Sequence, residues 1–190
     1  MRLLAISGSL RAGSLNTAVL QAARLLAPPG VDVDLYEGLE DLPAFNPDLD
    51  EPGTELPPLA NALRGRVSDA DGLLICSPEY AHGIPGSLKN LLDWLVGSVD
   101  FAGKQVTLIA ASHRSVFAQA QLAEVLRTMA ARLVPDEAVV VPVPSRAVDA
   151  RAIASDPQLA AILRHAITAA VQSLGGPPPV APNDPAGNGL

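Results

Sequence analysis

The sequence predicts an α/β fold with a doubly wound, five-stranded parallel sheet and helices on both faces. Short apolar runs alternate along the chain with longer segments whose apolar residues recur at helical spacing. Strictly alternating strand and helix units are typical of parallel sheets that are covered on both sides. A length of 190 residues also suits one domain with a sizeable core.

Five segments are predicted to be strands, and most of them are nearly continuous apolar runs, as expected for strands buried on both faces. The second differs, because its apolar residues alternate with Asp32 and Asp34. This alternation indicates one wet face and a place at or near an edge, which favours the strand order 2-1-3-4-5, although it also suits an inserted or frayed strand. The predicted strands span residues 2–6, 31–35, 72–76, 106–111 and 138–143.

Five segments with apolar residues at helical spacing are predicted to be helices. The last has the clearest boundaries, because Asp156 suits a helix cap, Pro157 suits a first turn and Gly175 suits an end. The predicted helices include residues 15–26, 59–67, 88–95, 122–133 and 157–174. Residues 37–58 are acidic and rich in Pro and Gly, which predicts a long surface loop held down by Leu42, Phe45 and Leu49.

Composition excludes several classes of function. The net charge of -7 argues against a nucleic-acid partner, and the single cysteine, Cys76, excludes an intrachain disulfide. No apolar run reaches membrane length and no signal-peptide pattern follows Met1, so a cytoplasmic protein without a membrane partner is expected. The scattered histidines and the one cysteine do not form a metal-site pattern. Residues 1–175 are predicted to form the domain, and residues 176–190 a disordered tail rich in Pro and Gly.

The first candidate binding loop follows the first predicted strand and precedes a helix, where N–H groups favour an anion. It offers short polar side chains and the planar cation of Arg11, and it lacks both the Walker A pattern and the Gly-x-Gly-x-x-Gly fingerprint. A site for one terminal phosphate is therefore predicted. The alternative is an ordinary Gly/Ser turn with a helix cap at Ser14.

The second candidate loop follows the third predicted strand and contains Pro78, Glu79, Tyr80 and Pro85. Ligands of parallel α/β sheets lie beyond the carboxyl ends of the strands, so this loop is predicted to meet the edge of a flat cofactor. The alternative is that Tyr80 is a packed loop aromatic and Glu79 a solvated charge.

Together the two loops resemble the NADPH-dependent FMN reductase family, the quinone, chromate and azo reductases of flavodoxin-like fold. The resemblance covers roughly residues 2–143. It rests on Gly8-Ser9-Leu10-Arg11-Ala12-Gly13-Ser14-Leu15-Asn16, on Ser77-Pro78-Glu79-Tyr80, and on the stretch from Ile84 to Trp94. Similar stretches occur at Phe101-Ala102-Gly103-Lys104 and at Ala118-Gln119-Ala120-Gln121-Leu122.

The resemblance implies an enzyme that binds FMN and uses NADPH or NADH. Hydride would pass through the flavin to a quinone, free flavin, azo or metal-oxyanion acceptor by a ping-pong mechanism, with no catalytic acid or base assigned. The residues implied around the phosphate are Ser9, Arg11, Ser14 and Asn16. Those implied along the ring edge are Pro78, Glu79, Tyr80 and Ala81, largely through backbone groups, with Ser112 and His113 as the other wall.

The chain departs from the family at residues 112–117, where glycines are common among the relatives and this sequence has none. That departure motivates a second hypothesis, an FMN-binding electron carrier or redox sensor without NAD(P)H turnover. A third is a cofactor-free interaction module on the same fold, against which Arg11 and the paired loops argue.

Three further residues carry narrower expectations. The resemblance implies a homodimer or homotetramer, and Trp94 lies off the apolar stripe of its predicted helix, so it is expected at a subunit contact or over a local gap. His82 is a candidate polar group near the acceptor, or a solvated loop histidine. Cys76 ends an apolar strand and is expected to be an inert core thiol.

Overall fold

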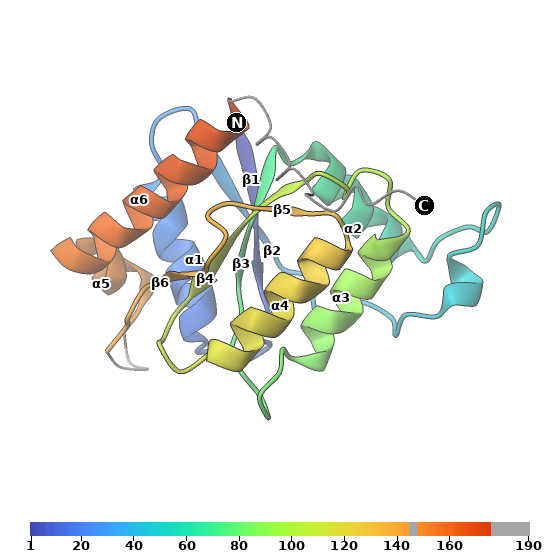
Figure 1. Ribbon diagram of the computed structural model, residues 1–190, viewed down its shortest axis with the longest axis horizontal. Coiled ribbons are helices and arrows are strands. Elements are labelled where there is room, and N and C mark those ends of the chain that lie inside the picture. The colour runs from blue at the N-terminus through green and yellow to red at the C-terminus, as the bar shows by residue number, and fades with distance from the viewer. Residues whose placement is uncertain (145–147, 176–190) are drawn as a thin grey trace, which may run out of the picture.

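The computed structural model describes residues 1–144 and 148–175, and their strands form one parallel sheet (Figure 1). The order β2-β1-β3-β4-β5 confirms the predicted topology, and β2 lies at an edge as its alternating sequence indicated. The tail predicted for residues 176–190 falls outside the described ranges. The strands are β1 (Arg2–Ser7), β2 (Asp32–Tyr36), β3 (Gly72–Cys76), β4 (Gln105–Ala110), β5 (Arg132–Leu133) and β6 (Val139–Val140).

The fifth position of the sheet is filled by two short strands rather than one. Residues of β5 pair with the beginning of β4, and those of β6 pair with its end. The expectation of a single strand over residues 138–143 is therefore wrong in extent, as is the expectation that the preceding helix continues to Leu133. That helix ends at Thr128, because Ala130 adopts a φ of 59° and Ala131 N–H bonds back to the Leu126 carbonyl. This is a Schellman end, which usually has glycine at the left-handed position.

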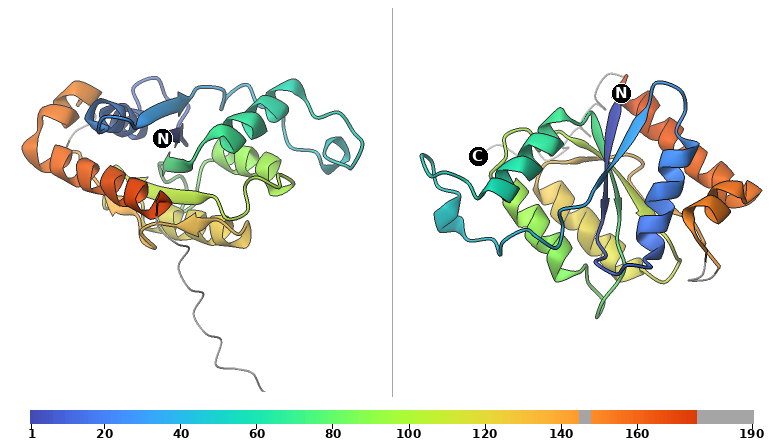
Figure 2. Two further views of the ribbon diagram at one scale, coloured as in Figure 1. Left: turned by 90° about the horizontal axis from the view of Figure 1, so that it is seen from above. Right: turned by 180° about the vertical axis from the view of Figure 1, so that it is seen from behind.

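The helices form two layers, one on each face of the sheet (Figures 1 and 2). One layer contains α1, α5 and α6, and the other contains α2, α3 and α4, as the two separate buried clusters show. The helices are α1 (Leu15–Leu26), α2 (Pro58–Asp69), α3 (Gly86–Val96), α4 (Val116–Thr128), α5 (Ala150–Ser155) and α6 (Pro157–Leu174), with a 3-10 turn at Pro47–Leu49.

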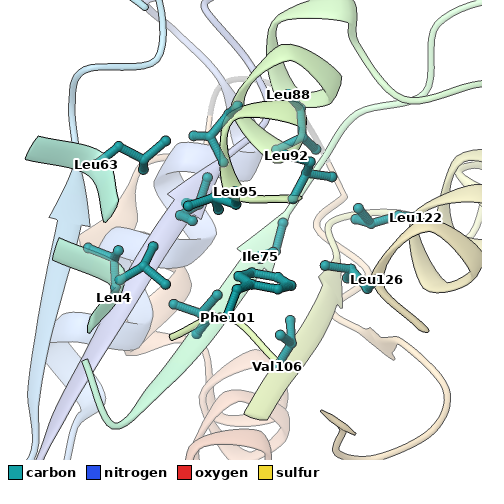
Figure 3. Close-up of a cluster of buried hydrophobic side chains, with 14 of the residues drawn as sticks. Leu4, Leu63, Ile75, Leu88, Leu92, Leu95, Phe101, Val106, Leu122 and Leu126 are labelled. Carbon is teal, nitrogen blue, oxygen red and sulfur yellow. The ribbon is translucent and has the colours of Figure 1, made fainter. Parts of the chain in front are cut away.

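Aliphatic side chains fill the space between the sheet and the α2–α4 layer (Figure 3). Leu4, Ile75 and Val106 face this layer from three neighbouring strands, and Phe101 lies among them. Alternate residues of the same strands face the α1, α5 and α6 layer, so the strands are buried on both faces. The helices contribute Leu63, Leu88, Leu92, Leu95, Leu122 and Leu126.

The last helix has the boundaries that its sequence indicates. The Asp156 carboxylate accepts hydrogen bonds from the N–H groups of Gln158 and Leu159, and Gly175 ends the helix. The short helix α5 was not predicted, because its six residues are too few to show a helical period.

Trp94 is fully buried within its own chain, which corrects the expectation that it marks a subunit contact. Its indole N–H donates to the Pro43 carbonyl at 2.8 Å, and its ring meets Phe45 edge-on at a centroid distance of 5.0 Å. The long loop after β2 therefore closes over the tryptophan. Leu42 and Phe45 anchor this loop as expected, whereas Leu49 remains 38% exposed.

Across residues 1–144 and 148–175, the structure contains no helix both long and apolar enough to cross a membrane.

Candidate functional site

Three loops meet at the carboxyl end of the sheet, at the lower edge of the molecule in Figure 1. They follow β1, β3 and β4, which are neighbours in the sheet and end within one residue of the same register position. Carboxyl ends of parallel strands at such a position are the usual place for a ligand. A cavity of about 470 Å³ lies between the start of α1, the β3 and β4 loops and residues 143–144.

The cavity brings together only part of the set predicted to bind the cofactor. Asn16, Pro78, Glu79 and Ser112 line it. Ser9 and Ser14 instead line smaller cavities on either side of the β1 loop, and His113 lines a groove beside α4. Arg11, Tyr80 and Ala81 are exposed on their loops and lie outside the lining of this cavity.

Sequence reasoning missed several residues of the cavity wall. Arg114 and Ser115 belong to the β4 loop, of which only the first two residues were predicted to contact FMN. Val143 and Pro144 follow the fifth strand position, and the rule that ligands lie beyond strand ends would have found them. The remaining lining residues are Leu15 and Ala111.

The β1 loop packs closely against the β3 loop at Gly8. The Gly8 N–H donates to the Cys76 carbonyl at 2.9 Å, and a Cβ on Gly8 would lie 2.6 Å from Ser77 Oγ and 3.0 Å from a Leu88 methyl. No side chain larger than hydrogen fits without displacement. Gly8 thus sets the distance between these two walls of the site.

The start of α1 contains the polar groups that were predicted for a phosphate. Ser14 is the helix cap, and its hydroxyl accepts from the Thr17 N–H at 3.5 Å. Ser9 Oγ accepts from the Arg11 N–H at 3.3 Å. Asn16 is buried, and its side-chain oxygen accepts from the Cys76 thiol at 3.3 Å. The capping role at Ser14 and a ligand role for this loop are compatible, since a cap uses only one of the free N–H groups.

Cys76 is fully buried, and burial raises the pKa of its thiol to about 12. The thiol therefore stays protonated at neutral pH, as expected for an inert core cysteine.

The β3 loop contains a tight hairpin from Tyr80 to Gly83. The N–H and carbonyl of Tyr80 both bond to Gly83, at 2.9 and 3.0 Å. Between them, Ala81 and His82 adopt φ values of 50° and 59°, the pattern of a type I′ turn. Such turns favour Asn and Gly, so these residues hold a conformation that their side chains disfavour. The Tyr80 side chain is 56% exposed.

Three contacts fasten this hairpin and its flanks to α4. The Glu79 carboxylate accepts from the Ala118 N–H at 3.0 Å, and Gln121 Oε1 accepts from the Ile84 N–H at 2.8 Å. The His82 ring stacks on Phe117 with the centroids 4.2 Å apart. The β3 loop and the start of α4 therefore form one connected wall.

The β4 loop has a compact turn without glycine. Ser112 Oγ accepts from the Arg114 N–H at 3.1 Å, and no residue from Ser112 to Phe117 has a positive φ. Glycine is therefore not needed for the backbone conformation of this loop. Phe117 turns toward His82 and is absent from the cavity lining.

Comparison with known proteins agrees with these features. The model of the NADPH-dependent FMN reductase family matches residues 1–144. An NAD(P)H-dependent FMN reductase of Pseudomonas aeruginosa is 39% identical over 114 residues, 59% of this chain and 60% of that protein. The NADH:(hydroxy)cinnamate reductase subunit CrdA of Vibrio ruber is 36% identical over 141 residues, 71% of this chain and 68% of that protein.

A solved structure extends the likeness to nearly the whole fold. The flavoenzyme NAD(P)H:(acceptor) oxidoreductase FerB of Paracoccus denitrificans superposes with a TM-score of 0.73 and 26% identity, over 92% of this chain and 97% of that one. By the match over residues 1–144 and the fold that surrounds them, the chain belongs to the NADPH-dependent FMN reductase family.

Proposed function

We propose that the protein is an NAD(P)H-dependent oxidoreductase that binds FMN at the carboxyl end of its sheet. The observation that carries this proposal is the cavity between the start of α1 and the β3 and β4 loops, in a chain of this family. The match to the Pseudomonas protein spans 60% of that protein's length, so the activity of that protein is a proposal for this chain.

The start of α1 suits the phosphate of FMN. First-turn N–H groups have no partner inside a helix, and the helix dipole favours an anion there. Ser9, Ser14 and Asn16 add short polar side chains, and the Arg11 guanidinium is exposed beside them. Ser9, Ser14 and Asn16 line different cavities, so a phosphate at this helix end would contact the first-turn N–H groups together with some of these side chains.

The β3 and β4 loops suit the two sides of the flavin ring. Pro78 and Glu79 line the cavity on one side, and Ser112, Arg114 and Ser115 on the other. Backbone contacts from the hairpin are more restricted than the resemblance implied, because the Tyr80 N–H is already bonded to Gly83. Ala81 and His113 lie farther from the cavity. They would therefore contact only the outermost edge of the flavin ring.

The proposed chemistry needs positioning from the protein more than acid or base catalysis. Bound FMN would supply the chemistry of hydride transfer from NAD(P)H to an acceptor such as a quinone, free flavin, azo compound or metal oxyanion. The loops hold the ring and leave one cavity, which the donor and the acceptor would use in turn. Ping-pong kinetics are therefore expected.

The test is a visible absorption spectrum of the purified protein before and after reconstitution with FMN, followed by anaerobic addition of NADPH or NADH. Flavin absorption that disappears on addition and returns with a quinone would support the reductase. Protein that cannot be loaded with FMN would exclude it. Bound flavin that neither NADPH nor NADH bleaches would instead favour the electron carrier or sensor.

We also propose that the protein forms a homodimer or homotetramer, through a surface other than Trp94. Support comes from two exposed aromatic side chains beside the site: Tyr80 at 56% and Phe117 at 55% exposure. Rings of this kind are common at subunit contacts. Light scattering of the protein and of Phe117→Ser would test this, with a loss of the larger species expected in the variant; a monomeric wild-type protein would contradict it.

A further inference from the structure

A second cavity, a mostly apolar groove of about 510 Å³, runs along α4 away from the candidate site. One wall is a stripe of α4 residues at helical spacing, from Val116 through Ala120 to Arg127. The other wall is the segment from Asp136 to Val140. The helix rises by roughly 16 Å between Val116 and Arg127, at 1.5 Å per residue. The groove is thus long enough to extend well beyond the loops of the site.

The groove begins where the candidate site ends. Ser112 and Ser115 line both cavities, and His113 lines the groove beside them. The two cavities are therefore adjacent, with residues of the β4 loop between them. The Arg114 side chain is exposed at this junction.

Beneath the surface of the groove, the lining residue Gln119 has an amide group with no partner among the described residues. Both amide atoms of Gln119 are buried, and neither forms a hydrogen bond with any of the described residues. Such an amide loses no bond if it turns to a ligand, and it gains both a donor and an acceptor contact. Gln121, two residues on, is different because its oxygen is already bonded to the Ile84 N–H at 2.8 Å.

The far end of the groove is acidic. Asp136 and Glu137 both line it, and no ion pair within the described residues involves either carboxylate. Arg127 is the cation there, and it donates to the Asp136 backbone carbonyl at 3.2 Å. Between the two ends, Ala120, Ala123 and Ala138 leave space for a flat group.

We propose that this groove binds the adenosine half of NAD(P)H, an inference that rests on the proposed function. The nicotinamide must reach the flavin, so the pyrophosphate has to leave the site past the β4 loop, where His113 and Arg114 can meet it. A glutamine amide pairs with the donor and acceptor on the edge of adenine. The Asp136 and Glu137 carboxylates suit the hydroxyl donors of a ribose.

The same carboxylates determine which nicotinamide cofactor fits. A 2′-phosphate on the adenosine ribose would bring at least one further negative charge close to Asp136 and Glu137, with only Arg127 to offset it. NADH is therefore expected to be preferred over NADPH, measured as the ratio of the two kcat/KM values.

The first test is direct binding of AMP and ADP-ribose to the full chain, by calorimetry, with and without FMN. Gln119→Leu should weaken both by about tenfold, because two hydrogen bonds are lost. Ala120→Leu, at an exposed position of α4, should block the groove sterically without disturbing the core. Gln158→Leu, exposed on α6, is the matched control and should bind as the wild type does.

Unchanged affinity in both groove variants, or no binding of AMP to the wild-type protein, would overturn the proposal. So would displacement of AMP by a quinone, since the groove would then belong to the acceptor. These measurements need no turnover. A protein that binds AMP but not FMN would refute the proposed function alone, and one that turns over NADH but ignores AMP would refute the groove alone.

The second test separates the two halves of the cofactor by kinetics. Gln119→Leu should raise KM for NADH while leaving that for reduced nicotinamide mononucleotide, which lacks adenosine, unchanged. The double variant Asp136→Asn, Glu137→Gln should raise kcat/KM for NADPH relative to NADH by about threefold to tenfold. Glu124→Gln is exposed on α4 and lies outside the groove, so it should leave this ratio unaltered. An equal change of this ratio in Gln119→Leu, in the double variant and in Glu124→Gln would contradict the assignment.

Discussion

The Glu79 carboxylate accepts a hydrogen bond from the Ala118 backbone N–H at 3.0 Å, and this bond joins the β3 loop to the first turn of α4. The cap residue of α4, Ser115, makes no side-chain cap of its own. Glu79 therefore caps the helix from a distant part of the chain, with its negative charge at the favourable end of the helix dipole. The β3 loop, one wall of the cavity, is held in this way by α4.

Removing this cap should destabilise the protein. Glu79→Ala is expected to lower the free energy of unfolding of the FMN-free protein by about 1–2 kcal/mol, because an N–H at the start of α4 loses its acceptor. Glu79→Gln should cost less, since it keeps an acceptor oxygen and loses only the charge. Urea denaturation measures both. Glu124→Ala, exposed on the same helix, serves as the control, and an equal effect of the two alanine variants would rule out the capping role.

Two glycines of the β1 loop should respond oppositely to alanine. Gly8→Ala places a Cβ 2.6 Å from Ser77 Oγ, so it should destabilise the protein by about 1–3 kcal/mol. Gly13→Ala meets nothing within 4 Å and should be neutral or slightly stabilising, because it reduces the entropy of the unfolded chain. Thermal unfolding of both variants without FMN would decide the matter. Similar melting temperatures for the two would show that the loops do not need their close contact.

The buried Cys76 thiol should make stability depend on pH in the alkaline range. Its pKa is raised from 9.0 to about 12, so below pH 9 the folded and unfolded states both keep the proton. Above pH 9 the unfolded state releases the proton and the folded state retains it. The free energy of unfolding should then fall by about 1.4 kcal/mol per pH unit.

The contribution of Cys76 is measured as the difference between the wild-type protein and Cys76→Ala from pH 8 to about 10.5, since other groups titrate equally in both. The difference should be constant below pH 9 and change in favour of the variant above it. Parallel curves throughout would contradict the burial of this thiol.

Arg11 should distinguish FMN from riboflavin, which lacks the phosphate. Arg11→Ala is expected to weaken FMN binding by about tenfold, and the loss should shrink at high salt, because the guanidinium acts through its charge. Riboflavin affinity should stay the same. Fluorescence titration of both flavins gives the two constants. Arg24→Ala, exposed near the end of α1, is the control. An equal loss of affinity for both flavins in Arg11→Ala would show that the phosphate does not lie beside Arg11.

Elements with strong local signals could be predicted from the sequence, and those without could not. The last helix begins at Asp156 because a cap and a proline stand together there. The end of α4 was missed because Ala130 occupies the left-handed position where glycine is usual. The strand β5 was missed for the same reason, since it follows that helix end directly and has only two residues.

The residues of the candidate site divide in the same way, into those with a local sequence signal and those without one. Pro78 and Glu79 were singled out because they follow an apolar strand, Ser112 was implied by the resemblance, and the cavity includes all three. Val143 and Pro144 stand at the end of the predicted fifth strand, and they were missed because no binding loop was predicted after that strand. Trp94 was misplaced because its position on α3 does not reveal the loop that covers it.

The sequence by itself determined the alternation of strands and helices, the edge position of β2 and the loops that meet at one end of the sheet. These follow from period, from apolar content and from glycine and proline, which act over a few residues. Only the tertiary structure decided that Glu79 caps α4, that Phe117 stacks on His82 and that the loop after β2 buries Trp94. Those contacts join residues 35 to 51 positions apart, where no local pattern specifies the partner.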